Sequence, residues 1–235
     1  MNSLIFDIET IGENFESLDE TTQDILTQWI KKESSSEGDY KVALEDLKNG
    51  LGFSPLTGEI VAIGVLDHER NQGVVYYQDP SGKQKETVEG DFKFKPCSEK
   101  EMLESFWAGA KNYREFVTFN GRAFDTPFLI TRSAVHGIKP TVDMMEGRYL
   151  YQQKGVRHID LLDQLTFYGA TRKKGNLHLW SRAFGIKSPK SEGVSGDDVG
   201  RLFKEKKYLE IAKYNVGDLL ATSELYNRWL EFFNS

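Results

Sequence analysis

Apolar residues recur along the chain with two different periods, which indicates that strands and helices alternate. Short apolar or alternating runs predict strands at 4–8, 59–67, 73–78 and 115–119. Apolar residues at helical spacing predict helices at 18–32, 40–51, 98–113, 125–136 and 207–233. The turn residues 71–73 predict a hairpin between the second and third strands, whereas the polar stretch 79–95 is typical of a loop or an irregular edge. This interleaving predicts an α/β fold built in layers.

The stretch between the first two strands, residues 13–54, differs in character from the rest. It holds two helical patterns, separated by the polar, serine-rich run 34–38 that is typical of a loop. It has too little apolar surface to form a core alone. We therefore expect one domain, residues 1–235, with a helical insertion at about 13–54.

Charge and composition limit the kind of protein this chain can be. The net charge of −6 argues against a protein that coats long nucleic acids by charge alone. The segment 148–190 is an exception, because it carries nine basic residues and two acidic ones. Cys97 is the sole cysteine, so neither an intrachain disulfide nor a cysteine zinc cluster can form. A secretory signal and a membrane-length apolar run are both missing from the sequence, and we expect a soluble, cytoplasmic protein without a membrane partner.

Two acids, Asp7 and Glu9, come at the end of the first apolar run. Residues two apart on a strand point to the same face, so the two carboxylates are expected side by side. That arrangement is costly near a core unless a cation lies between the acids. An Asp-x-Glu pair alone is also common on surface strands. The nearly continuous apolar lead-in, residues 4–6, indicates a central strand and favours a site.

A second candidate acid, Asp125, follows the strand at 115–119 and an Asn-Gly turn. It comes at the start of a predicted helix, where an Asp is also a good cap. A helix cap and a metal ligand are therefore both open for Asp125. The surrounding pattern of strand, Asn-Gly, aromatic residue, Asp and Pro is more specific than a cap requires.

The late helix carries Tyr214 and Asp218, which are four residues apart and so lie on one helix face. An amphipathic helix with a half-buried Tyr and a solvated Asp would show the same spacing. Gly217, which precedes the acid, costs roughly 1 kcal/mol relative to alanine within a helix. Close approach of another group is a usual reason for such a glycine.

Taken in order, these three signals resemble the DEDD family of exonucleases in its tyrosine form, DEDDy. In particular, they are similar to the proofreading domains of family B DNA polymerases and their stand-alone bacterial relatives. Residues 55–64 and 158–163 resemble those proteins as well. The likeness runs from Asp7 to the helix of Asp218 and leaves the insertion unplaced. The remaining length has no room for polymerase palm or fingers, so we expect the nuclease module alone.

The resemblance implies a ribonuclease H-like fold, with a five-stranded mixed sheet flanked by helices and its first three strands antiparallel. It also implies two divalent ions, Mg²⁺ or Mn²⁺, bound by Asp7, Glu9, Asp125 and Asp218. In the family pattern Asp7 bridges both ions, Glu9 and Asp218 complete one site, and Asp125 holds the second ion through water. These ligands offer only oxygen, which suits hard cations.

The activity implied by the resemblance is 3′→5′ hydrolysis of single-stranded DNA or RNA ends, with release of nucleoside 5′-monophosphates. Two metal ions can stabilise the attacking and the leaving oxygens of such a displacement. Tyr214 would orient the attacking water, since a phenol with a pKa of about 10 is a poor base at neutral pH.

Residues beside the acids are the predicted contacts to substrate. Thr10, Asn120 and Phe124 are expected to bind the terminal nucleotide. The aromatic ring of Phe124 can stack on a base of any sequence. A place in the core is the alternative for Phe124. We interpret His158 as structural or near the site. For Asp160 a helix cap is favoured, and support of the site is the alternative.

Two other functions remain open at this point. One is a catalytically silent relative that binds nucleic acid or protein, although such relatives usually lack one or more of the acids. The other is a hydrolase of very short oligonucleotides, against which the basic segment 148–190 argues mildly. The basic run 172–174 fits either the phosphates of a strand or a solvated loop. Three further questions stay open: the choice between DNA and RNA, the oligomeric state and the role of the insertion. One interpretation of the insertion is a lid or strand guide.

Overall fold

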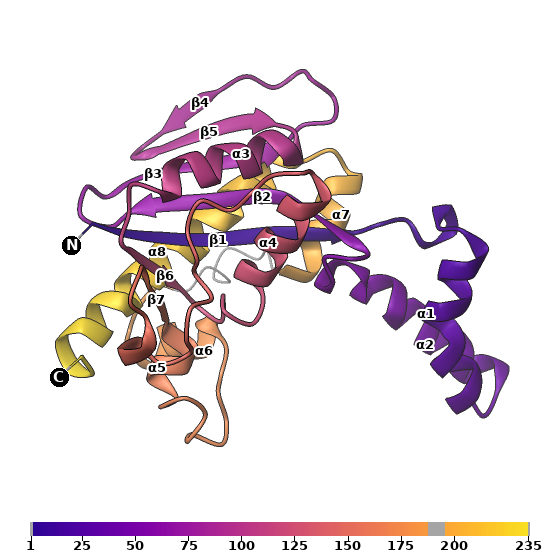
Figure 1. Cartoon of the computed structure of the whole chain (residues 1–235). Helices are drawn as coiled ribbons and strands as arrows, with labels where there is room; N and C mark the ends of the chain where they lie inside the picture. The colour runs from indigo at the N-terminus through magenta and orange to yellow at the C-terminus, as the bar shows by residue number, and fades with distance from the viewer. Residues whose placement is uncertain (1, 188–195, 235) are drawn as a thin grey trace.

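One mixed sheet of seven strands forms the centre of the molecule in the computed structural model, which describes residues 2–187 and 196–234 (Figure 1). The strands are β1 (Ser3–Gly12), β2 (Gly58–Asp67), β3 (Gln72–Gln78), β4 (Thr87–Glu89), β5 (Phe92–Cys97), β6 (Glu115–Thr118) and β7 (Arg157–Asp160). Their order across the sheet is β4-β5-β3-β2-β1-β6-β7. Of the basic segment, residues 188–190 lie outside the described residues.

The first three strands are antiparallel, as predicted, since β2 pairs in this way with both β1 and β3. On the other side of β1, the strands β6 and β7 run parallel to it. The carboxyl ends of β1, β6 and β7 therefore meet at one edge of the sheet, where open α/β sheets commonly place their ligands.

The sheet has two strands more than the five expected, because β4 and β5 form at its edge, largely within the stretch 79–95 that the sequence pattern assigns to a loop or an irregular edge. In β5, Phe92 and Phe94 are buried and Lys93 between them is exposed. All three residues of β4 are exposed at the edge of the sheet. Two buried aromatic residues among lysines give too short an alternation to indicate a strand. Asp125 consequently follows the sixth strand of the chain rather than the fourth.

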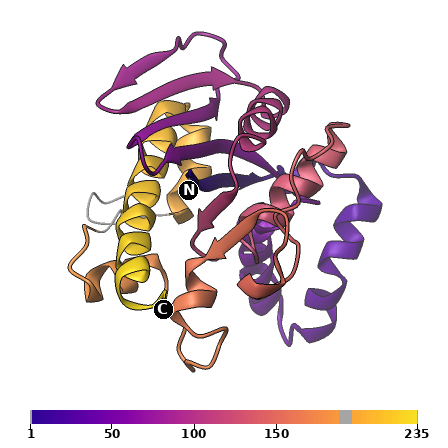
Figure 2. The same cartoon turned by 60° about the vertical axis from the view of Figure 1, so that its left-hand side comes forward.

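Helices cover both faces of the sheet. They are α1 (Glu20–Glu33), α2 (Glu37–Gly50), α3 (Glu99–Ala110), α4 (Asp125–Val135), α5 (Leu161–Leu165), α6 (Leu177–Ala183), α7 (Val199–Lys204) and α8 (Tyr208–Phe232). The long helix α8 lies along one face, and α3 and α4 lie on the other (Figures 1 and 2). Within the described ranges, every helix is too short or too polar to cross a membrane.

The alternation of side chains along β1 divides the core into two layers. Ile5 belongs to the cluster on the α8 side. Phe6 belongs to the other cluster, where its ring meets Phe106 of α3 at a centroid distance of 5.3 Å. Because Asp7 and Glu9 are two and four residues after Ile5, they point to the α8 side as well.

The predicted insertion consists of the hairpin α1–α2, which projects from the end of β1 (Figure 1). Its return to the sheet is tightly packed. A Cβ atom on Gly12 would lie 2.6 Å from the Cβ of Leu51, and one on Gly52 would lie 2.9 Å from the amide nitrogen of Gly12. The Thr10 hydroxyl also donates a hydrogen bond of 2.7 Å to the carbonyl of Gly52. The residues that follow Gly52 are therefore held against the carboxyl end of β1.

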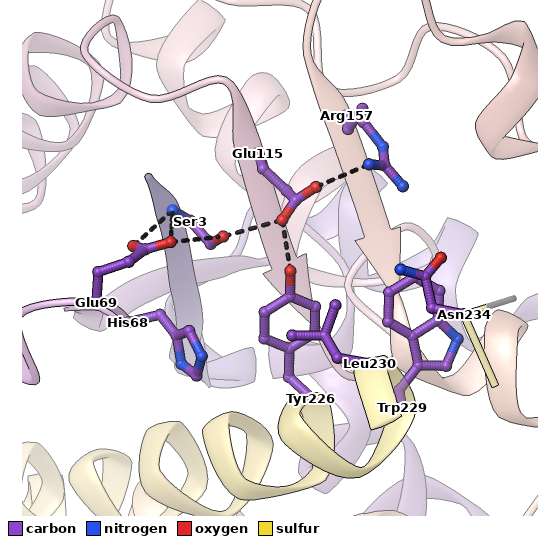
Figure 3. Close-up of a pocket in the computed structure, with 9 residues that line it drawn as sticks. All are labelled: Ser3, His68, Glu69, Glu115, Arg157, Tyr226, Trp229, Leu230 and Asn234. Carbon is purple, nitrogen blue, oxygen red and sulfur yellow. Dashed lines mark hydrogen bonds and ion pairs between the residues drawn. The ribbon is translucent and has the colours of Figure 1, made fainter. Parts of the chain in front are cut away.

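A polar cluster at the amino ends of β1, β6 and β7 ties these strands to α8 (Figure 3). Its centre is Glu115, which is 4% exposed. The carboxylate accepts hydrogen bonds from the hydroxyls of Ser3, at 2.9 Å, and of Tyr226. Nη1 of Arg157 lies 3.3 Å from its other oxygen. A small cavity of about 320 Å³ lies beside the cluster. The cluster is about 13 Å along β1 from Asp7, at 3.3 Å per residue.

We expect Glu115→Gln to lower stability without changing activity. The amide cannot replace the charge beside Arg157, and it donates where the carboxylate accepts. The expected loss is about 1–2 kcal/mol, or roughly 2–8 °C in Tm for a chain of this size. Thermal unfolding measures the first effect, and Glu104→Gln, at an exposed acid of α3 outside the cluster, is the control. An unchanged Tm would show that the cluster contributes nothing.

Candidate functional site

Two carboxylates from β1 form one side of the candidate site. Asp7 and Glu9 point to the same face of the strand, as predicted, and Glu9 is only 7% exposed. The pairing of β1 with β2 shifts register directly after Glu9, which pairs with Ala62, whereas Thr10 pairs with Ile60. Bulges of this kind are common next to active sites, because they redirect a side chain.

The helix α8 supplies the other side. Asp7, Glu9 and Asp218 each offer a carboxylate oxygen, and these three oxygens all lie within 4.8 Å of one another. One turn earlier on the same helix face, Tyr214 lies close enough to Asp218, Glu9 and Asp7 for their charges to add to the effect of burial and raise the pKa of its phenol. The structure thus brings together the acids of the first strand with the Tyr-x-x-x-Asp pattern of the late helix.

Asn215 contacts two of these acids, a role that the sequence analysis did not assign to it. Its side-chain nitrogen donates hydrogen bonds to Asp7, at 2.8 Å, and to Glu9, at 3.3 Å. Asn215 is fully buried, and its Oδ1 atom has no hydrogen-bond partner among the described residues. That oxygen lies against Gly64, where a Cβ atom would come within 1.8 Å of it. Because Gly64 is the β2 partner of Asp7, it leaves the space that lets the amide reach the acids.

A fourth carboxylate, that of Asp125, reaches the site from the start of α4. It is 4% exposed, and its Oδ1 accepts a hydrogen bond of 3.0 Å from the backbone nitrogen of Ile8. The side chain thus contacts β1, and the cap position of α4, Phe124, makes no side-chain capping bond. The sequence left a helix cap and a metal ligand open for Asp125. Its contact is with β1, so Asp125 is not simply a cap of α4.

The Asn-Gly turn before α4 is held in place by Asp160. Asn120 adopts a left-handed backbone with φ of 65°, which asparagine tolerates better than most residues. A Cβ atom on Gly121 would lie 2.5 Å from Thr118, so the turn also needs a glycine. The carboxylate of Asp160 accepts hydrogen bonds of 2.9 Å from the backbone nitrogens of Asn120 and Arg122. It also caps α5, so the predicted cap is confirmed and Asp160 supports the site beside it.

His158 is structural, as predicted. It is buried, with Nε2 2.9 Å from the Thr118 hydroxyl and Nδ1 3.1 Å from the Met144 carbonyl. Burial lowers the pKa of the imidazole to about 3, so the ring is neutral at physiological pH.

Burial and mutual repulsion act together on the acids. Burial, and then the charges of Asp125, Asp218 and Glu9, raise the pKa of Asp7 well above its ordinary value. Burial, and then the charge of Asp218, also raise the pKa of Glu9. The hydrogen bonds from Asn215 lower the pKa of both acids and so oppose these shifts. Burial raises the pKa of Asp125 to about 7. A divalent cation would relieve this repulsion, and the oxygen donors fit a hard cation.

A small cavity of about 210 Å³ opens over these groups. The four acids line it, together with Ile8, Phe119, Asn120, Phe124 and Leu177. The predicted contacts Asn120 and Phe124 therefore lie beside the acids, and Leu177 from α6 is a further neighbour that the sequence patterns do not indicate. Thr10 lines the adjoining groove instead, and its hydroxyl already donates a hydrogen bond to the carbonyl of Gly52.

This fold, with carboxylates gathered at the strand ends, defines a nuclease-like α/β protein, and comparison with known proteins gives the family. Residues 58–234 match the family described as "Predicted 3'-5' exonuclease related to the exonuclease domain of PolB". The chain belongs to this family and is a PolB-like 3′→5′ exonuclease domain.

Two relatives show how much of a larger protein the chain resembles. It is 30% identical over 146 residues to a DNA polymerase of Desulfurococcus sp. (strain Tok), a match that covers 54% of this chain and 18% of the polymerase. The structure of the family B DNA polymerase from the archaeon Pyrobaculum calidifontis is similar with a TM-score of 0.59 and 18% identity. This match covers 98% of this chain and 25% of the polymerase. The fold is thus ribonuclease H-like, as expected. The chain spans about a fifth to a quarter of these polymerases.

The raised pKa of Asp125 predicts how stability depends on pH without metal. Between its ordinary value of 3.8 and about 7, the folded state binds more protons than the unfolded state. This acid therefore makes the free energy of unfolding fall as the pH rises through that range. Asp125→Asn has no such group. Above about pH 7, we expect the free energy of unfolding of this variant to exceed that of the wild type by about 2 kcal/mol, or roughly 4–8 °C in Tm.

Thermal unfolding in EDTA at several pH values between about 5 and 8 measures this difference. Mn²⁺ should reverse the order of stability, because the metal stabilises the ionised wild-type carboxylate. A difference in Tm that does not change with pH would contradict the raised pKa.

Proposed function

We propose that this chain is a metal-dependent 3′→5′ exonuclease of the DEDDy type that acts on single-stranded nucleic acid ends and releases nucleoside 5′-monophosphates. The observation that carries the proposal is the convergence of Asp7, Glu9 and Asp218, whose oxygens lie within 4.8 Å of one another, with Asp125 in the same cavity. A cluster of this kind, in a chain of an exonuclease family, is best explained by metal-assisted phosphodiester hydrolysis.

The four acids would hold two divalent ions, Mg²⁺ or Mn²⁺. Asp7, Glu9 and Asp218 would be the ligands of one site, and Asp125 would take part in the second together with Asp7. The bound ions supply charge stabilisation for the attacking and the leaving oxygens of the phosphodiester. Asn215 orients the β1 carboxylates through its two hydrogen bonds, so that they do not depend on the metal alone for their position.

Tyr214 is proposed to orient the attacking water. Burial, and then the neighbouring acids, raise the pKa of this phenol far above its ordinary value, so it stays protonated at neutral pH. Its hydroxyl is therefore a positioning group and not a general base. Asp218, one turn further along the same helix face, would accept its proton in a hydrogen bond and so set the direction of the hydroxyl.

The strand is proposed to approach along the basic loop that precedes α6. Leu177, the first residue of α6, lines the cavity of the acids. The exposed basic residues 172–174 come directly before this helix. Lysine and arginine at this point can neutralise phosphates next to the end that is cleaved. Asn120 and Phe124, which line the same cavity, would contact the terminal nucleotide.

Degradation of 5′-labelled single strands tests the proposal. DNA and RNA are each incubated with Mg²⁺ or Mn²⁺, with EDTA and Asp7→Ala as the controls. The expected result is a ladder that shortens from the 3′ end, together with nucleoside 5′-monophosphates, in the metal reactions of the wild type alone. The faster polymer shows which sugar the protein prefers.

The same assay separates the two other readings of the sequence. A rate that collapses as the substrate lengthens would indicate a hydrolase of very short oligonucleotides. Binding of a labelled strand without cleavage by either metal would indicate a catalytically silent relative. Both outcomes would overturn the general exonuclease proposal.

A further inference from the structure

An exposed aromatic residue from the insertion, Phe53, stands next to the candidate site. It lies where the insertion returns to the sheet, directly after Gly52, whose carbonyl accepts the Thr10 hydroxyl. The contacts of Gly12 and Gly52 fix this return at the end of β1. Phe53 therefore has a defined position even though its side chain is 70% exposed.

The ring of Phe53 extends an aromatic surface that begins in the cavity of the acids. Phe124 lines that cavity and rests on Phe128, with ring centroids 5.5 Å apart. Phe53 meets Phe124 from the outside, at a centroid distance of 6.5 Å and an interplanar angle of 65°. The two rings thus form a corner whose inner part borders the acids and whose outer part is open to solvent.

The groove on the other side of Phe53 is not suited to phosphates. This groove, of about 1450 Å³, runs between the insertion, the end of β1 and α7. Among the described residues that line it, six are acidic and three are basic. The basic residue Lys48 is already paired with Glu16 and Glu45, and Arg201 with Glu205. A sugar–phosphate backbone is repelled there, whereas an uncharged base can stack on the exposed ring.

We propose that Phe53 stacks on a base at the 3′ end of the substrate and forms, with Phe124, a wall of the nucleotide site. This inference rests on the proposed exonuclease function and assigns the insertion a role in substrate selection. The wall accepts a base that is free of its complementary strand, with the phosphates directed away from the acidic groove and toward the basic loop. The expected substrate is an unpaired 3′ end, and a paired end must fray before it binds.

The test compares Phe53→Ala, Phe53→Trp and the wild type on two single strands that differ only at the 3′ terminus. One ends in a normal nucleotide and the other in an abasic residue. The polymer is whichever of DNA and RNA the wild type hydrolyses faster. Leu56→Ala is the matched control, because Leu56 is 78% exposed and lies three residues further along, in the turn 55–57 before β2. Tm is measured for every variant.

The expected result is a loss in kcat/KM for Phe53→Ala of about five- to thirtyfold on the normal end, the lower part of the range for base–aromatic stacking. On the abasic end, Phe53→Ala and the wild type should agree within about twofold. Phe53→Trp keeps an aromatic face and should retain activity on the normal end. Leu56→Ala should match the wild type on both ends.

Two results would overturn the inference alone: wild-type rates for Phe53→Ala on the normal end, or an equal loss on both ends, which marks a structural role. A wild type that hydrolyses neither strand with either metal would overturn the exonuclease proposal as well. The two failures are therefore distinguishable.

Discussion

Asp7→Asn is expected to slow metal-dependent hydrolysis by about a thousandfold or more while the protein stays folded. Asp7 is the acid that lies next to all the others, since Asp125, Asp218 and Glu9 all raise its pKa. Asn is nearly isosteric and keeps an oxygen, but it has no charge to hold a divalent cation. In EDTA the variant should be at least as stable as the wild type, because a repelled carboxylate has been removed.

Single-turnover rates on a 5′-labelled strand measure the first effect, and thermal unfolding in EDTA measures the second. Asp46→Asn is the matched control, because Asp46 is an exposed acid on α2 and should retain wild-type rates. A folded Asp7→Asn variant with more than about a tenth of the wild-type rate would argue that hydrolysis does not depend on this cluster.

Gly64→Ala is expected to damage both stability and activity, although Gly64 lines neither the cavity of the acids nor the adjoining groove. The added Cβ would lie 1.8 Å from Oδ1 of Asn215 and 2.8 Å from Cδ1 of Leu219. Either α8 moves away from the sheet or Asn215 loses its bonds to Asp7 and Glu9. We expect a loss of about 2–3 kcal/mol in stability and a roughly 10- to 100-fold loss in kcat.

A second substitution shows whether the clash with Asn215 is the cause. The double variant Gly64→Ala/Asn215→Ala removes the crowded amide, so its Tm should recover toward that of Asn215→Ala alone, while kcat stays low. Gly109→Ala, on α3 where an added Cβ meets nothing within 4 Å, is the control and should not lower the Tm. If Gly64→Ala retained the wild-type kcat, Asn215 would have no positioning role.

Much of the candidate site follows from local geometry, which a sequence displays directly. The alternation of a strand places Asp7 and Glu9 on one face, and the turn of a helix aligns Tyr214 with Asp218. Both relations depend only on residues two or four apart. The hairpin of β2 and β3 is local in the same sense, and it forms as the turn residues 71–73 predict.

Other features depend on contacts between distant segments, and only the tertiary structure decides them. Asn215 bonds to acids more than 200 positions away in the chain, and Asp125 bonds to the backbone of Ile8 rather than capping its own helix. The strands β4 and β5 form where the sequence is mostly polar, because β5 pairs with β3 and β4 pairs with β5.

The sequence by itself determined which carboxylates share a face, because side-chain direction in a strand or helix repeats over a few residues. It did not determine the space at Gly64 or the place of Phe53 beside Phe124. A glycine and an exposed phenylalanine have no periodic signature, and their roles arise from what the packed chain brings within a few ångströms of them.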